Sequence, residues 1–293
     1  MKALLLLLPA VGAYVPSPAP TPLARRIARG TARYTPAVHG SATLLATSAL
    51  SPQVVQAVGL NSALAGLGVA KKQKMLTPAG LAHAWALGVI LWGALGWRGW
   101  STCVVYLLCG SRVTKVKMAK KEALGIAEGR GGMRGPENVW GSAATAAVCA
   151  LGSAAFPGKR ALLQLGFVAS LATKLSDTCA SEIGKAFGKT TYLITTLRLV
   201  PPGTEGAVSL EGTAAGALGS VVLTAWAAAI GLLGAAPLVP SAVCVVAAFF
   251  ATNFESVIGA VAQDKYPWLT NELVNGIMTV VGAAAGMGLS LLL

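Results

Sequence analysis

Long apolar segments separated by short polar loops fill the chain from about residue 54 to its last residue. Their lengths predict about eight membrane-spanning helices, or six to eight because the first and third are short. A tight turn is expected at 97–100, between the second and third segments. The pattern predicts an all-α fold, a polytopic helical bundle in a membrane, with spans at about 54–70, 79–96, 98–111, 138–156, 161–180, 209–235, 238–260 and 271–293.

The composition excludes an ordinary soluble domain. Of the 293 residues, 55% are hydrophobic and 11% are charged, whereas soluble domains carry about 25% charged residues. The net charge of +13 raises the question of a nucleic-acid partner. The basic residues, however, are spread over short loops without an aromatic platform, so we expect contact with membrane lipid and no nucleic acid.

Residues 1–40 have the composition of a targeting presequence, which leaves 41–293 as the membrane domain. Met1-Lys2 and a short apolar run resemble a signal peptide, and a stretch with four arginines and no acid follows, as in a transit peptide. This order predicts a bipartite presequence of the kind that directs proteins to complex algal plastids. The alternative is a secretory signal followed by a spacer. The expected location is therefore a plastid membrane, either the chloroplast envelope or the thylakoid.

The loop charges indicate how the chain is oriented. With eight spans, one side of the membrane receives loops 71–78, 112–137, 181–208 and 261–270, which carry fourteen basic residues, and the other side receives three. Such a bias is typical of the positive-inside rule. In a plastid the charge-rich loops would face the stroma, which holds nucleotides.

The polar stretch from Lys174 to Glu211 holds four of the ten carboxylates. At about 100° per residue, six of its polar side chains fall on one helix face: Lys174, Asp177, Thr178, Ser181, Glu182 and Lys185. Carboxylates bind Mg²⁺ and lysines neutralise phosphates, so Asp177, Glu182 and Lys185 are the predicted catalytic residues. An internal ladder of i,i+3 ion pairs, 174–177 and 182–185, explains the same face equally well.

Glu255 lies about a turn and a half inside the seventh span, where an unpaired acid costs about 2.5–3.5 kcal/mol. A metal shared with Asp177 would balance its charge. The predicted metal ligands are Asp177, Glu182, Glu255 and Asp264.

Other polar residues of the loops are predicted to bind the phosphorylated substrates: Lys174, Lys189, Arg198, Glu205, Arg134 and Lys265. Anchoring at the lipid headgroups is the commoner role for an arginine such as Arg198, and composition alone favours a flexible basic loop for the glycine-rich segment around Arg134. Gly188-Lys189-Thr190 is not a Walker motif, because only three residues separate it from Gly184 and no strand is expected before it.

Two strings resemble those of an integral-membrane family that includes transmembrane protein nineteen: SDTCASEIG at 176–184 and TTLRLVPPGTEGAVSL at 195–210. The similarity is closer to the plastid branch, the phytyl-phosphate kinases of vitamin E synthesis, and covers roughly 55–293. It extends to shorter strings at 76–83, 95–99, 114–115, 134–136, 184–192, 211–213 and 263–265. Glu137 and Asn138 depart from the small residues expected after Arg134-Gly135-Pro136, which weakens a phosphate-binding role for that loop.

The resemblance implies that 41–293 is a kinase domain. It would transfer a phosphoryl group from a nucleoside triphosphate, with CTP favoured over ATP, to phytyl phosphate. The product, phytyl diphosphate, would serve tocopherol synthesis, with phylloquinone as a second destination. A phytol or polyprenol kinase acting on the free alcohol, with Asp177 as its base, is one alternative. A transporter is another, although acids gathered at one membrane face argue against an ion path through the midplane.

Overall fold

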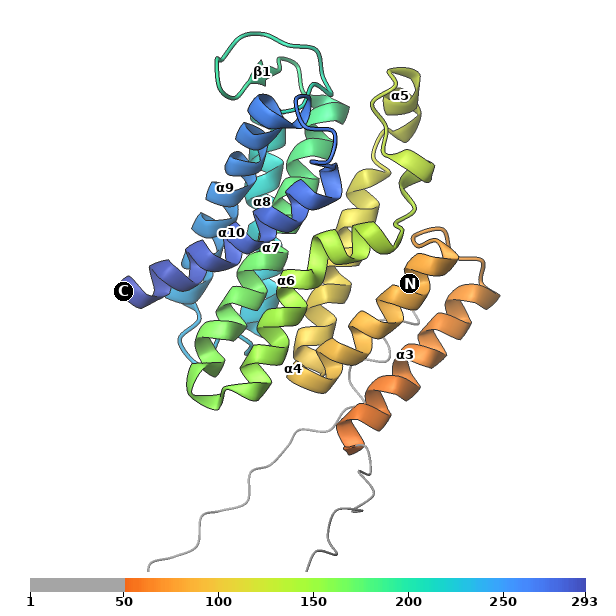
Figure 1. Ribbon diagram of the computed structural model, residues 1–293, viewed down its shortest axis with the longest axis vertical. Coiled ribbons are helices and arrows are strands. Elements are labelled where there is room, and N and C mark those ends of the chain that lie inside the picture. Colours follow the sequence, from red (N-terminus) through yellow and green to blue (C-terminus); the bar gives the residue numbers. More distant parts are fainter. Residues whose placement is uncertain (1–50) are drawn as a thin grey trace, which may run out of the picture. The chain divides into compact units, whose positions relative to one another are not determined.

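The computed structural model describes residues 51–293 (Figure 1). The presequence expected at 1–40 lies outside the described residues and stays a prediction. The elements are α3 (Pro52–Ala70), α4 (Pro78–Thr114), α5 (Met118–Ala123), η1 (Gly129–Gly132), α6 (Pro136–Ala155), η2 (Pro157–Lys159), α7 (Arg160–Phe187), β1 (Tyr192–Leu193), β2 (Ala207–Val208), α8 (Leu210–Ala229), α9 (Leu238–Ile258), η3 (Gly259–Gln263) and α10 (Asn271–Leu292). The predicted helical bundle is confirmed, and β1 and β2 add a short antiparallel hairpin.

Helix α4 contains the turn expected between the second and third apolar segments. Gly96 has φ 67° and ψ −161°, a backbone conformation that is essentially restricted to glycine. The turn therefore lies one residue before the predicted 97–100 segment, and the two arms of α4 run in different directions from it (Figure 1). Trp92 and Trp100, one from each arm, pack edge to face with their ring centroids 5.6 Å apart.

Side-chain caps mark where several helices begin. Ser209 Oγ accepts a hydrogen bond from Gly212 N at 3.1 Å, and Glu211 lies in the first turn of α8. Thr77 and Thr270 cap α4 and α10 in the same way. Such caps satisfy amides that lack a partner within the helix, and an acid in the first turn complements the helix dipole.

Five helical segments are long and apolar enough to cross a membrane: Pro52–Ala70, Pro78–Thr114, Leu210–Ala229, Leu238–Gln263 and Asn271–Leu292. Each of the eight apolar segments of the sequence is helical, with both arms of α4 counted separately. Helices α6 and α7 are not among the five, because small and polar residues lower their hydropathy. The exact number of spans stays a prediction.

Helix α7 forms the centre of the bundle and packs against α4, α6, α8, α9 and α10. Every residue from Leu165 to Cys179 is buried. Glycines of α8 allow its backbone to approach α7 closely, since a Cβ on Gly212 would lie 2.5 Å from the carbonyl oxygen of Ala180. The polar half of α7 is thereby enclosed by other helices.

The charge-rich loops gather at one end of the bundle. Helix α5, the β1–β2 hairpin and the segment between α9 and α10 lie at this end, and the α6–α7 connection lies at the opposite end (Figure 1). This arrangement agrees with the sorting of loops by charge. The compartment that this end faces stays a prediction.

Candidate active-site cavity

A cavity of about 190 Å³ opens at the charge-rich end of the bundle. Its walls come from α7, the 128–134 loop, the start of α6, the 202–209 loop, α8, α9 and α10. The six polar residues predicted to share one face of α7 all line it: Lys174, Asp177, Thr178, Ser181, Glu182 and Lys185.

Lys174 and Asp177 form an ion pair near the middle of the cavity wall. Lys174 Nζ donates to Asp177 Oδ2 at 2.6 Å and to Asn275 Oδ1 of α10 at 2.9 Å. Both residues are buried. The lysine is thus held from two helices, and Asp177 is fixed in one orientation toward the cavity.

Both i,i+3 pairs of the predicted ladder are present, Lys174–Asp177 at 2.6 Å and Lys185–Glu182 at 4.0 Å, and Glu182 has a second, closer partner. Its Oε2 accepts a hydrogen bond from Lys121 of α5, and both side chains are almost fully buried. Lys121 Nζ also donates to the carbonyl oxygen of Thr114 at 2.6 Å. The ladder partner, Lys185, lies 4.0 Å from Glu182 Oε1 and is partly exposed. Glu182 therefore joins α5 to α7, and the Lys185 ammonium faces the cavity.

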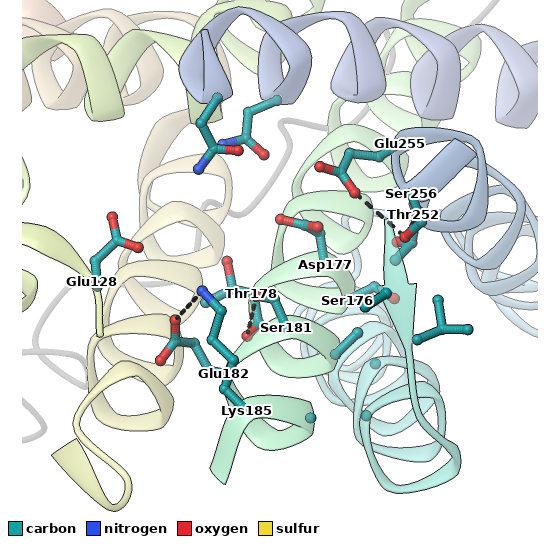
Figure 2. A pocket seen from close by; sticks show the side chains of 18 of the residues that line it. Glu128, Ser176, Asp177, Thr178, Ser181, Glu182, Lys185, Thr252, Glu255 and Ser256 are labelled. Atoms are coloured by element: carbon teal, nitrogen blue, oxygen red, sulfur yellow. Dashed lines mark hydrogen bonds and ion pairs between the residues drawn. The ribbon is translucent and has the colours of Figure 1, made fainter. Parts of the chain in front are cut away.

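Asp177 and Glu255 point into the same part of the cavity from α7 and α9 (Figure 2). Among residues 51–293, Glu255 is part of none of the four ion pairs, and it accepts one long hydrogen bond, from Ser256 Oγ at 3.5 Å. On the same wall, the buried Thr252 hydroxyl has no hydrogen-bond partner. The cavity thus places the carboxylates of Asp177 and Glu255 near the Thr252 hydroxyl, and Lys174 is the ion-pair partner of Asp177.

Glu205 reaches the cavity from the loop between the two strands. Gly203 has φ +90°, and Thr204 N donates to Pro201 O at 3.3 Å, which gives the turn at 201–204 a type II geometry. Gly206 has φ +73°, and a Cβ there would lie 2.5 Å from the carbonyl oxygen of Ser256, so glycine lets the loop pack onto α9.

The charge of Glu205 is tuned by its surroundings. Glu205 is exposed as a residue, but its carboxyl is partly buried, and this burial raises the pKa of the carboxyl. Lys185 lowers that pKa, and the charges of Asp264 and Asp177 raise it further. Two of these charges, those of Asp177 and Lys185, belong to α7.

The glycine-rich loop before α6 is held in place by backbone bonds. Arg134 N donates to Met75 O at 2.9 Å, and Thr77 N donates to Arg134 O at 3.0 Å. The Arg134 side chain lines the cavity and donates to the hydroxyl of Tyr106. These bonds hold the backbone of Arg134 against the segment that precedes α4, and the flexibility of the glycine-rich part of the loop stays a prediction.

Glu137 and Asn138, the two departures from the family pattern, have structural partners. Arg130 pairs with Glu137 and donates to Asn138 Oδ1 at 2.8 Å. Asn138 Nδ2 in turn donates to Glu272 Oε1 of α10 at 3.2 Å. These bonds join the loop to α6 and α10.

The structure does not bring every predicted site residue to this cavity. Seven line it: Arg134, Lys174, Asp177, Glu182, Lys185, Glu205 and Glu255. Four are exposed and lie outside the lining: Lys189, Arg198, Asp264 and Lys265. Among residues 51–293, no group of three His, Cys, Asp or Glu side chains is placed to hold a metal ion. A four-acid metal site made of Asp177, Glu182, Glu255 and Asp264 is therefore not formed by these side chains alone.

Sequence reasoning missed Lys121, Asn275 and Tyr106. Lys121 is one of seven basic residues in the loop 112–137, and nothing in its sequence context distinguishes the one that is buried. Asn275 is 101 residues from Lys174, in an apolar helix whose other asparagine, Asn271, is its first residue.

Comparison with known proteins matches residues 61–283 to a family described as integral membrane protein DUF92. The chain is 56% identical over 236 residues to the uncharacterized membrane protein sll0875 of Synechocystis, covering 80% of this chain and 90% of that protein. It is 47% identical over 242 residues to Protein VTE6, chloroplastic, of Arabidopsis thaliana, covering 80% of this chain and 71% of that protein. It is 31% identical over 220 residues to the uncharacterized membrane protein MJ0933 of Methanocaldococcus jannaschii, covering 74% of this chain and 87% of that protein. No solved structure matches.

Proposed function

Because this chain belongs to the DUF92 family of integral membrane proteins, we propose that its polar cavity transfers a phosphoryl group from a nucleoside triphosphate, with CTP favoured over ATP, to phytyl phosphate. The product would be phytyl diphosphate. The observation that carries the proposal is the pairing of carboxylates and lysines in one cavity at the end of an apolar bundle. Both substrates are phosphates, and one of them carries a long apolar tail.

The cavity has what phosphoryl transfer needs. Catalysis of this reaction rests mainly on positioning and on neutralising phosphate charge. Lys185 supports that role, because its ammonium lies 4.0 Å from Glu182 and has donors left for phosphate oxygens. Arg134 is suited to bidentate phosphate binding by its planar guanidinium. A phosphate monoester is already an anionic nucleophile, so the acceptor requires no strong base.

The donor set fits Mg²⁺. This ion prefers oxygen ligands, and one or two protein carboxylates usually hold it together with substrate phosphates and water. Asp177 and Glu255 would hold it, since both point into the cavity from different helices and Glu255 is in none of the four ion pairs among residues 51–293. Glu182 is bound to Lys121, and Asp264 lies outside the cavity lining, so we do not propose either residue as a Mg²⁺ ligand. Bound Mg²⁺ would neutralise phosphate charge and orient the transferred group.

Lys174 serves as a positioning residue in this scheme. Its ammonium has three N–H donors and donates hydrogen bonds to Asp177 and to Asn275. Lys174 therefore fixes the Asp177 carboxylate and keeps a positive charge beside it. The hydroxyls of Thr178 and Ser181 lie on the same wall and are available to phosphate oxygens.

We place the protein in a plastid membrane and in tocopherol synthesis. The support is the presequence composition of residues 1–40 and the relative whose name is Protein VTE6, chloroplastic. Fusing residues 1–45 to a fluorescent reporter tests the location. Import into the plastid is expected, and secretion of the reporter would refute it.

The activity is tested in membranes that contain the full chain. They are given Mg²⁺, γ-labelled CTP or ATP, and either phytyl phosphate or phytol. We expect labelled phytyl diphosphate when phytyl phosphate is the acceptor, and no labelled product when phytol is the acceptor. Label transferred to phytol would identify the alcohol kinase instead, and no transfer to either lipid would refute a kinase.

A further inference from the structure

A second cavity, of about 170 Å³, lies beside the first between α3, both arms of α4 and the start of α6. Carbon atoms dominate its walls, which include Leu64, Ala84, Leu91, Val104 and Val139. Its indole and amide groups already have partners: Trp100 Nε1 donates to Asn61 Oδ1 at 3.1 Å, and Asn61 Nδ2 donates to the carbonyl oxygen of Ala57 at 2.8 Å. The cavity therefore suits a hydrocarbon ligand.

The two cavities share a wall. Arg134, Asn138 and Ser142 line both of them. A polar cavity and an apolar cavity therefore meet at these three residues, an arrangement that matches the two ends of an amphiphilic molecule. The residue at the junction that carries a charge is Arg134.

The contacts of the Arg134 guanidinium orient it to bind an anion at this junction. Its Nη1 donates to the hydroxyl of Tyr106, with the guanidinium carbon 5.3 Å from the ring centroid. None of the ion pairs among residues 51–293 includes Arg134, so its charge is not matched by a carboxylate contact. Gly110 leaves room for the guanidinium, since a Cβ at that position would lie 2.9 Å from Nη2.

We propose that the second cavity binds the first part of the prenyl chain of a prenyl monophosphate, and that Arg134 binds its phosphate at the junction of the two cavities. The proposal rests on the proposed function for the identity of the ligand. A cavity of about 150 Å³ lined by apolar side chains binds benzene, so this one accommodates the isoprene units next to the phosphate. The remainder of a longer chain would lie against the lipid-facing side of the bundle.

Photolabelling tests the site without requiring turnover. The probe is a prenyl monophosphate with a diazirine in its first isoprene unit, added to the purified full chain in lipid nanodiscs without nucleotide. Labelled peptides from both arms of α4, within 81–91 and 100–107, are expected. Label confined to α9 or α10 would overturn the proposal, and so would loss of label on adding excess phosphatidylglycerol, because the cavity would then be a general lipid site.

Two variants with matched controls sharpen the test. Ala84→Phe fills the cavity and should raise the half-saturating probe concentration about tenfold or more, whereas Ala82→Phe, on an exposed face of the same helix, should leave it within about twofold. Arg134→Gln should weaken labelling by the monophosphate about tenfold but not labelling by the corresponding alcohol. Equal labelling of all variants would contradict the site.

The photolabelling result is independent of the transfer assay. Labelling at α4 without any phosphoryl transfer would keep the lipid site and refute the proposed activity. Transfer without labelling at α4 would keep the activity and refute this site.

Discussion

Asp177 and Glu182 lie five residues apart on α7, and each forms an ion pair with a lysine in different surroundings. Asp177 is paired with Lys174 on its own helix, at 2.6 Å, and points into the cavity beside Glu255. Glu182 is paired with Lys121 from α5, and both side chains are almost completely buried. The first pair is positioned for chemistry on a ligand, and the second joins a loop helix to the centre of the bundle.

The residue types of these two pairs do not by themselves determine whether a pair faces a ligand or joins two helices. Both pairs contain an acid and a lysine, and both acids belong to the same polar face of α7. What separates them is the neighbouring element, α5 for Glu182 and α9 for Asp177. A buried ion pair contributes little net stability, but removing one partner leaves an uncompensated charge. We therefore expect mutations of the first pair to reduce turnover and mutations of the second to reduce stability.

The largest expected effect is that of Asp177→Asn. It should lower the rate of phytyl diphosphate formation about 100-fold or more, because a preorganised charge in the cavity is lost. Because Asp177→Asn also leaves the buried Lys174 without its counter-charge, its rate is compared at equal amounts of folded protein. The matched control is Asp264→Asn, an exposed acid outside the cavity, which should stay within about twofold of the native rate. Similar rates for both variants would remove Asp177 from the mechanism.

Glu182→Gln should destabilise the protein by about 3–5 kcal/mol, because it leaves the Lys121 ammonium buried without its counter-charge. Thermal unfolding in detergent measures this loss. The double variant Lys121→Met with Glu182→Gln should regain most of the stability and part of the activity. A double variant that is stable but inactive would instead support the catalytic role predicted for Glu182 from the sequence.

Lys185→Gln should raise the KM for the nucleotide about tenfold, because a charge-assisted bond to phosphate is lost. Lys189→Gln removes the same charge from an exposed position outside the cavity and should change KM by less than about twofold. Initial rates at varied nucleotide concentration separate the two. A larger increase in KM for Lys189→Gln than for Lys185→Gln would instead assign the phosphate site to the segment between α7 and β1.

The smallest expected effect concerns Glu205 and pH. Burial raises the pKa of its carboxyl, so the folded state binds the proton more tightly than the unfolded state. The contribution of Glu205 to stability is therefore greatest below the unfolded pKa and is lost as the pH rises through the raised folded pKa. Between about pH 4 and pH 7, the unfolding temperature of ligand-free Glu205→Gln should decline slightly less than that of the native chain. Identical pH profiles would contradict the assigned environment.

Local patterns were enough to predict part of this molecule. Helical periodicity placed six polar residues on one face of α7, and Ser209 and the Pro201–Gly203 turn follow from their own neighbours. The contacts that distinguish the two ion pairs are not local: Lys121 is 61 residues from Glu182, and Asn275 is 101 residues from Lys174. The shared wall of the two cavities likewise depends on how α4, α6 and α7 pack, which no single segment encodes.

The most direct test of the central claim is the initial rate of phytyl diphosphate formation from γ-labelled CTP and phytyl phosphate in proteoliposomes. Purified native chain, Asp177→Asn and Asp264→Asn are compared at equal amounts of folded protein, with Mg²⁺ present. We expect labelled diphosphate from the native chain and from Asp264→Asn, and a rate lower by about 100-fold or more from Asp177→Asn. No labelled diphosphate from the native chain, or equal rates from all three proteins, would contradict it.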